Sequence, residues 1–86
     1  MAKAKDEITY EVECTDTFGG EANYTWVRRE EIKVPKGASR RMLIGRAKRA
    51  VGRQAVPTRN SELGDGLRMD VVGAAIVIFV TCKEEP

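Results

Sequence analysis

Residues 39–52 have the sequence SRRMLIGRAKRAVG and predict the one helix of this chain. Ser39 is a good N-cap and Gly52 stands where a left-handed C-terminal cap is expected, so about three helical turns lie between them. Projected at about 100° per residue, the apolar side chains fall within one arc, formed by Leu43, Ile44, Ala47, Ala50 and Val51. This stripe predicts a helix that packs against a sheet.

A β-hairpin is predicted before this helix. Residues 8–14 alternate strictly between apolar and polar side chains, which indicates a strand with one solvated face. Residues 23–34 are rich in aromatic and β-branched side chains, and Pro35 stops this second strand because proline lacks the amide hydrogen that a ladder needs. The segment 15–21, with Gly19 and Gly20, supplies the turn.

After the helix, residues 54–66 show no periodicity and predict a long surface loop. Residues 71–80 are apolar at both parities, which predicts a strand that is covered on both faces or lies at the centre of the sheet. Residues 73–75, Gly-Ala-Ala, mark a bulge, a bend or a short hairpin within it. The expected fold is α+β: strand, strand, helix, then one bulged strand or two short ones, in a small antiparallel sheet with the helix on one face.

The 86 residues are enough for a single domain, with residues 1–5 and 83–86 expected to be frayed. The longest apolar run, residues 71–82, is shorter than the about twenty residues of a membrane-spanning helix, so no membrane association is expected. No secretion signal is recognisable, which favours the cytoplasm. In that reducing compartment we expect Cys14 and Cys82 to be buried thiols.

The charge distribution is the strongest functional signal. Between Ile32 and Ser61 the chain has no acidic residue but nine cations, Lys33, Lys36, Arg40, Arg41, Arg46, Lys48, Arg49, Arg53 and Arg59. The whole chain has fifteen cations and thirteen acids, so the remaining six cations and thirteen acids sum to −7. A segment this basic predicts a surface for an anionic partner. The candidate anion-binding residues are Lys36, Arg40, Arg41, Arg46, Lys48, Arg49, Arg53 and Arg59.

Catalytic chemistry has little support. The chain has no histidine, and its two cysteines lack the spacing of a zinc site, so we expect neither an enzyme nor a metal or other cofactor. Gly37, Ala38 and Ser39 enter the helix beside three cations and offer backbone amides to a phosphate or carboxylate.

One helix covers only one face of a sheet, whereas the last predicted strand is apolar on both. An uncovered apolar face is therefore expected, with Tyr24, Trp26, Val72, Ile76 and Ile78 as candidates. Either a homodimer or protein partner covers it, or the 54–66 loop folds over it. Acids including Glu13, Glu30, Glu31 and Glu62 could also neutralise the basic face, within the fold or across a dimer.

Two functions compete. The first is a nucleic-acid-binding accessory protein whose helix follows phosphates, with Trp26 or Tyr24 available for stacking. The second is a protein-binding inhibitor or modulator of a host factor, for example an anti-CRISPR or anti-restriction type protein. It would be anchored by the uncovered apolar face and the Tyr24 and Trp26 pair, and its basic face would dock onto an acidic partner surface.

The stretch 16–29, DTFGGEANYTWVRR, followed by a basic helix and the closing GAAIVIFV of residues 73–80, resembles short uncharacterised proteins encoded by bacteriophages and prophages. The resemblance spans most of the chain and carries no established activity. It implies life in a bacterial cytosol and binding to host or phage macromolecules, and it does not indicate the target.

Overall fold

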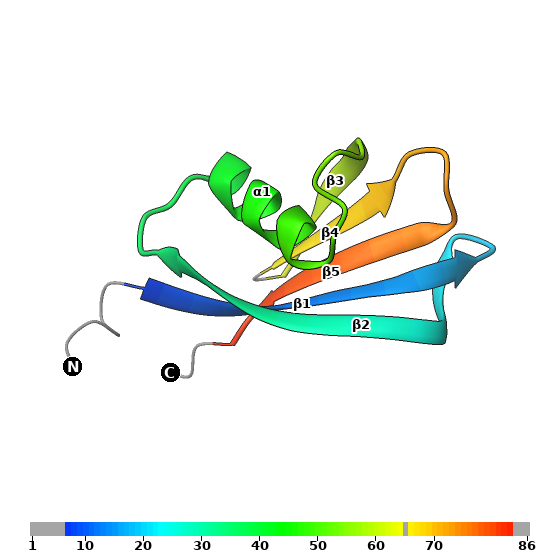
Figure 1. Ribbon diagram of the computed structural model, residues 1–86, viewed down its shortest axis with the longest axis horizontal. Helices are drawn as coiled ribbons and strands as arrows, with labels where there is room; N and C mark the ends of the chain where they lie inside the picture. The colour runs from blue at the N-terminus through cyan, green and yellow to red at the C-terminus, as the bar shows by residue number, and fades with distance from the viewer. Residues whose placement is uncertain (1–6, 65, 84–86) are drawn as a thin grey trace.

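The computed structural model describes residues 7–64 and 66–83. In that part of the chain, five strands form one antiparallel sheet in the order β2-β1-β5-β4-β3, and one helix covers one face of it (Figure 1). The elements along the chain are β1 (Glu7–Phe18), β2 (Glu21–Pro35), α1 (Arg40–Ala50), β3 (Thr58–Leu63), β4 (Gly66–Val71) and β5 (Ile76–Cys82). The predicted antiparallel sheet with a helix is confirmed. The predicted layout is incomplete, because three strands rather than one or two follow the helix.

The helix has the predicted limits. The Ser39 hydroxyl accepts a hydrogen bond from the Met42 amide at 3.1 Å, and Gly52 has the left-handed φ of 73° that ends a helix. Ala47 is fully buried and Val51 nearly so, which places the predicted apolar stripe against the sheet. Within residues 7–64 and 66–83, no helix has the length and hydropathy needed to span a membrane.

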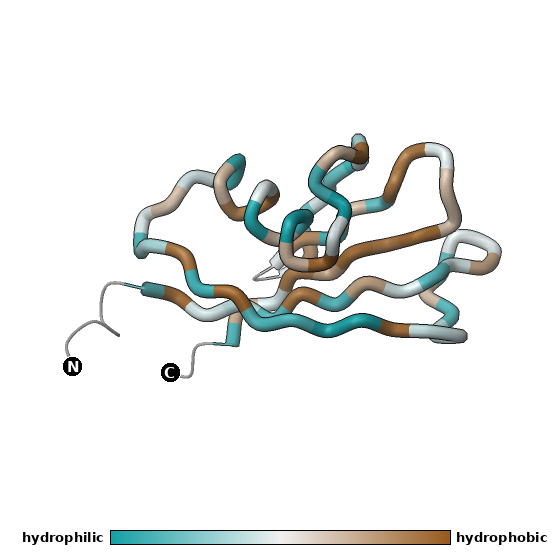
Figure 2. The backbone as a smooth tube through the Cα atoms, viewed as in Figure 1, coloured by the Kyte–Doolittle hydropathy of each residue, from teal (hydrophilic) through white to brown (hydrophobic). Residues whose placement is uncertain are grey.

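The core lies between α1 and one face of the sheet. Side chains at alternate positions of the central strands fill it, with Val12, Cys14, Met69, Ile78 and Val80 at most 1% exposed. Figure 2 shows β5 as a long hydrophobic run at the centre of the sheet, while much of the edge strand β2 is hydrophilic. Both cysteines are free thiols; Cys14 is buried as expected, whereas Cys82 is only half-buried.

One segment differs from the sequence prediction, and a second decides between alternatives that the sequence left open. Residues 58–63, predicted as part of a loop, form the edge strand β3. All but one of its residues are exposed, so it carries no apolar alternation to signal a strand. In residues 71–80 the structure has the short hairpin, one of the predicted alternatives: β4 ends at Val71, Gly73 takes φ 83° in the turn, and β5 begins at Ile76.

The β1–β2 hairpin is longer than predicted and contains a bulge. Only Gly19 and Gly20 form its turn, both with positive φ, which matches a two-residue type I′ turn. Thr15 pairs with Val27 and Thr17 with Ala22, so one residue of β1 faces the four residues 23–26 of β2. We call residues 23–26 the hairpin bulge.

The ends of the chain are described only in part. Residues 1–5, expected to be frayed, and residues 84–86 lie outside the described residues. Lys83 was included in the frayed end, but it is held: its amide donates to the Thr9 carbonyl at 2.9 Å and its ammonium pairs with Glu31 at 3.0 Å.

Candidate functional site

The outer surface of α1 carries most of the predicted cations. Arg41, Arg46 and Arg49 are exposed on it, Lys48 is half-buried, and Lys36 is exposed just before the helix. Among the described residues, none of these five forms a salt bridge. The helix also has no acid in its first turn, where acids are favoured by the helix dipole. In the described chain, the positive charge of these five residues is therefore not compensated by salt bridges.

Three of the acids that could neutralise this face are paired with other cations. Glu13 pairs with Arg29 at 2.8 Å, Glu30 with Arg28 at 3.2 Å, and Glu31 with Lys83. These three cations all lie outside the acid-free segment. The sequence left open whether acids within the fold neutralise the basic face. In the described chain, such neutralisation is observed for a single helix cation, Arg40.

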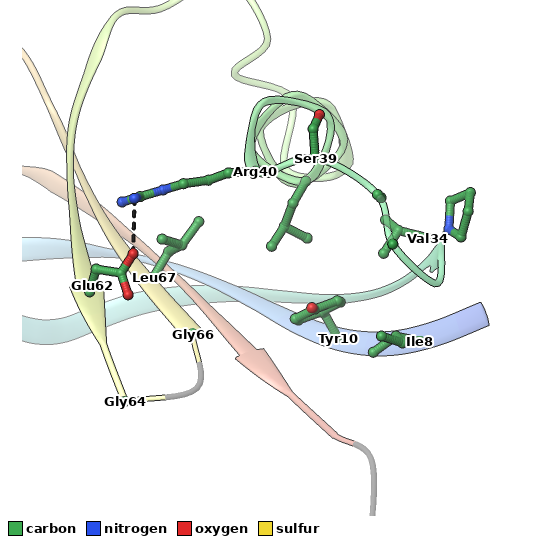
Figure 3. Close-up of a pocket in the computed structure, with 13 residues that line it drawn as sticks. Ile8, Tyr10, Val34, Ser39, Arg40, Glu62, Gly64, Gly66 and Leu67 are labelled. Carbon is green, nitrogen blue, oxygen red and sulfur yellow. Dashed lines mark hydrogen bonds and ion pairs between the residues drawn. The ribbon is translucent and has the colours of Figure 1, made fainter. Parts of the chain in front are cut away.

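Arg40 turns away from the outer surface of α1. Its guanidinium donates to the Glu62 carboxylate on β3 at 2.9 Å, across the mouth of a pocket of about 260 Å³ at the start of the helix (Figure 3). Apolar side chains including Ile8, Val34 and Leu67 line this pocket. Ser39 caps the helix, and Arg40 is neutralised by Glu62. The anion site predicted at the helix entry therefore keeps only part of its positive charge.

Arg59 does not extend the helix face. In the β3–β4 register it lies opposite Asp70, while its neighbours Thr58 and Asn60 lie opposite Val71 and Met69. Val71 and Met69 belong to the core beneath α1. Because side chains alternate along a strand, Arg59 points away from the helix, and its prediction as part of the same basic surface is wrong.

Arg46 and Arg49 lie on the flank of α1 towards the edge strand β2, and Arg53 follows shortly after the helix ends at Ala50; we call these three residues the arginine row. Arg46 donates to the Lys33 carbonyl of β2 at 3.0 Å, and Arg53 lies over the Trp26 ring of the same strand, 6.0 Å from its centroid. Arg49 lies between them in sequence and lines a shallow depression with Arg46 at Gly45.

The predicted uncovered apolar face is not formed by the residues named for it. Ile78 is fully buried beneath α1, Ile76 packs against the same core, and Val72 lies in the β4–β5 turn. The apolar residues of β5 that alternate with Ile76 and Ile78 lie on the face of the sheet away from α1. On that face, Val77 is fully buried and Arg68 lies over the Phe79 ring. The alternative, a loop folded over this face, is also wrong, because residues 58–63 extend the sheet as an edge strand.

Tyr24 and Trp26 do not form a pair. Trp26 lies beside Arg53 on the helix side, whereas the Tyr24 hydroxyl donates to Glu13 at 3.2 Å. Glu13 alternates with the core residues Val12 and Cys14, so it lies on the face away from α1. Burial and the nearby Glu13 charge raise the pKa of the Tyr24 phenol.

Side chains of β1 hold the hairpin bulge in place. The buried Thr15 hydroxyl accepts from the Tyr24 amide at 3.1 Å and donates to the Trp26 carbonyl at 2.8 Å. Asp16 accepts from the Thr25 amide at 2.9 Å and from the Asn23 side chain at 3.1 Å. Partial burial opposes ionisation of Asp16, but the hydrogen bonds from Thr25 and Asn23 outweigh it and hold the pKa well below its ordinary value.

Sequence reasoning missed this bulge and its consequence for Trp26. Asp16 was assigned to a turn, where aspartate is common, but it lies within β1. The available signal was a polar pair, Thr15 and Asp16, in a strand opposite residues 23–26, Asn-Tyr-Thr-Trp. Several registers of the two strands fit this signal equally well. In residues 7–64 and 66–83, no group of three or more His, Cys, Asp or Glu is placed to hold a metal ion.

Comparisons with protein-family models, with curated proteins and with solved structures find no match to this chain. The resemblance to bacteriophage and prophage proteins therefore stays a prediction.

Proposed function

We propose that this protein is a small, non-enzymatic accessory protein of bacteriophage or prophage type that binds the phosphate backbone of nucleic acid in the bacterial cytoplasm. Its contact surface is the outside of α1, with the arginine row as its central part. The observation that carries this proposal is the unequal pairing of charges. Acids pair with cations outside the acid-free segment, while the helix cations other than Arg40 form no salt bridge in the described chain.

The arginine row has a suitable chemistry. One strand of duplex DNA presents a phosphate about every 3.4 Å along its axis, and the row offers one cation to each of three phosphates. Guanidinium groups bind phosphate oxygens with two parallel hydrogen bonds. Arg46 donates one hydrogen bond to the Lys33 carbonyl. It has further donors, because a guanidinium has five N–H groups.

The salt dependence of binding tests this proposal. Three phosphate contacts predict that the logarithm of the association constant falls by about 2.7 per tenfold rise in salt on duplex DNA, and by about 2.1 on a single strand. The triple variant Arg46→Gln, Arg49→Gln, Arg53→Gln should lose most of this slope. Arg59→Gln is the matched control, since it removes an exposed cation on the other face of the sheet. Absence of any complex at low salt, or an equal effect of both variants, would contradict the proposal.

A second candidate is a protein-binding inhibitor or modulator of a host factor. Phe18 at the hairpin tip is 79% exposed and Val72 in the β4–β5 turn is 51% exposed. The Thr17 amide donates to the Ala75 carbonyl at 2.9 Å, which brings these two turns to the same end of the molecule (Figure 1). A pull-down from bacterial lysate treated with nuclease separates the candidates: a partner that persists and is lost with Phe18→Ala supports protein binding.

A further inference from the structure

Trp26 lies at the end of the arginine row. It is the one tryptophan of the chain, and 40% of its surface is exposed even with the Arg53 guanidinium lying over its ring. A cation above an indole ring is attracted by the negative charge of the ring face. The pair therefore joins an aromatic surface to the last cation of the row.

Arg53 has an unused donor at this point. Its Nε atom is buried and has no hydrogen-bond partner in the described structure. Buried donors are nearly always paired, because burial removes their hydrogen bonds to water. Arg28 is also close by, 3.5 Å from the position that a Gly52 side chain would take, but it is already paired with Glu30 at 3.2 Å. An anion bound beside Trp26 would therefore meet the guanidinium of Arg53, which forms no salt bridge in the described chain.

The hairpin bulge fixes the position of Trp26. Tyr24 adopts a φ of 54°, a conformation that is unfavourable for a tyrosine, and the fully buried Thr15 hydroxyl holds the Trp26 carbonyl. A regular hairpin would avoid this strain but would shift Trp26 along β2 relative to α1. Bulges commonly redirect a side chain next to a binding site.

From these observations we infer that the nucleic acid is single-stranded, with its phosphates along the arginine row and one base stacked on Trp26. This inference rests on the proposed function. In a duplex both faces of each internal base are covered by its neighbours, so an aromatic side chain has no face to contact. In a single strand every base offers a free face, and stacking is tolerant of sequence.

The test uses the intrinsic fluorescence of Trp26, which reports on this one position. The full chain is titrated at low salt with a thymidine oligonucleotide, an abasic oligomer of equal charge, and a duplex. The thymidine strand should quench the fluorescence and bind more tightly than the abasic oligomer. Trp26→Ala has no tryptophan signal, so its affinities are measured from the anisotropy of a dye-labelled probe. It should lower affinity for the thymidine strand by about 5- to 150-fold more than affinity for the duplex or the abasic oligomer. Trp26→Phe, which keeps an aromatic ring, should lose less.

The controls separate this inference from the proposed function. Phe18→Ala removes an exposed aromatic far from the row and should change no affinity, and circular dichroism checks that each variant is folded. Salt-dependent binding with equal affinity for the thymidine and abasic strands, and with no quenching, would refute single-strand stacking and leave backbone binding intact. Absence of binding to all three probes would refute both.

Discussion

Replacing Gly45 by alanine should stabilise this protein. Gly45 lies in the middle of α1 and is exposed, and a methyl group added at its Cα would meet no atom within 4 Å. Its φ is not in the left-handed region, unlike that of Gly52. Glycine in a helix loses more backbone entropy on folding than alanine does. The substitution therefore removes a cost and introduces no clash.

The expected gain is large for a chain of this size. Glycine is about 0.8–1.0 kcal/mol less favourable than alanine in a helix interior. A domain of 86 residues has a total stability of about 4–13 kcal/mol at typical values per residue. One kcal/mol corresponds to about 4–8 °C in the melting temperature of a domain of this size. Gly45→Ala should thus raise the melting temperature by about 3–8 °C.

Urea unfolding followed by far-UV circular dichroism measures this gain in stability. Gly66→Ala is the control, because it should lower stability. A Cβ at Gly66 would lie 1.8 Å from the Val80 carbonyl oxygen and 2.9 Å from its carbonyl carbon. These atoms belong to the β5 backbone, which cannot move without breaking the sheet, so a loss of at least about 2–3 kcal/mol is expected.

Two results would refute this reasoning. An unchanged or lower urea midpoint for Gly45→Ala would mean that residue 45 is not in an exposed helix, or that its surface is already in contact with another molecule. A Gly66→Ala variant of normal stability would mean that β4 does not begin against β5 as described.

Three further predictions follow from the helix cap, the hairpin bulge and the charged face. Ser39→Ala should lower stability by about 1 kcal/mol, measured by urea unfolding, because the Met42 amide loses its acceptor. Asp16→Asn should be less stable than the wild type at neutral pH. Since the folded pKa of Asp16 is depressed, its contribution is complete above its ordinary pKa of 3.8 and is lost as pH falls below that value, so the two midpoints should converge in acid. Added salt should raise the stability of the free protein while it weakens nucleic-acid binding, because it screens both the repulsion along the helix and the attraction to phosphate.

The helix and the first hairpin could be predicted because local signals determine them. Ser39 and Gly52 mark the limits of the helix, and the apolar spacing between them determines which side is buried. The two glycines at 19 and 20 determine the hairpin turn. Each of these features depends on residues that are close in sequence.

The features that were missed depend on partners that are distant in sequence. β3 is a strand only because β4 pairs with it, and its exposed polar residues give no periodic pattern. The orientation of Arg59 depends on that register, and the neutralisation of Arg40 depends on Glu62 lying across the pocket mouth. The arginine row was visible as one side of the helix, but its position beside Trp26 depends on the hairpin bulge.

The sequence of α1 is not the one that would make this helix most stable, and this bears on its role. Its exposed side has a glycine in place of a better helix former, and no acid stands between Arg40 and Ala50 to pair with the cations. Arginines three residues apart, such as Arg46 and Arg49, repel each other by a few tenths of a kcal/mol. Acids in the first turn would have lowered this cost and favoured the helix dipole. Natural proteins keep such locally unfavourable choices chiefly at functional sites. The repulsion between these cations raises the free energy of the unbound protein. We therefore expect a bound anion to lower it.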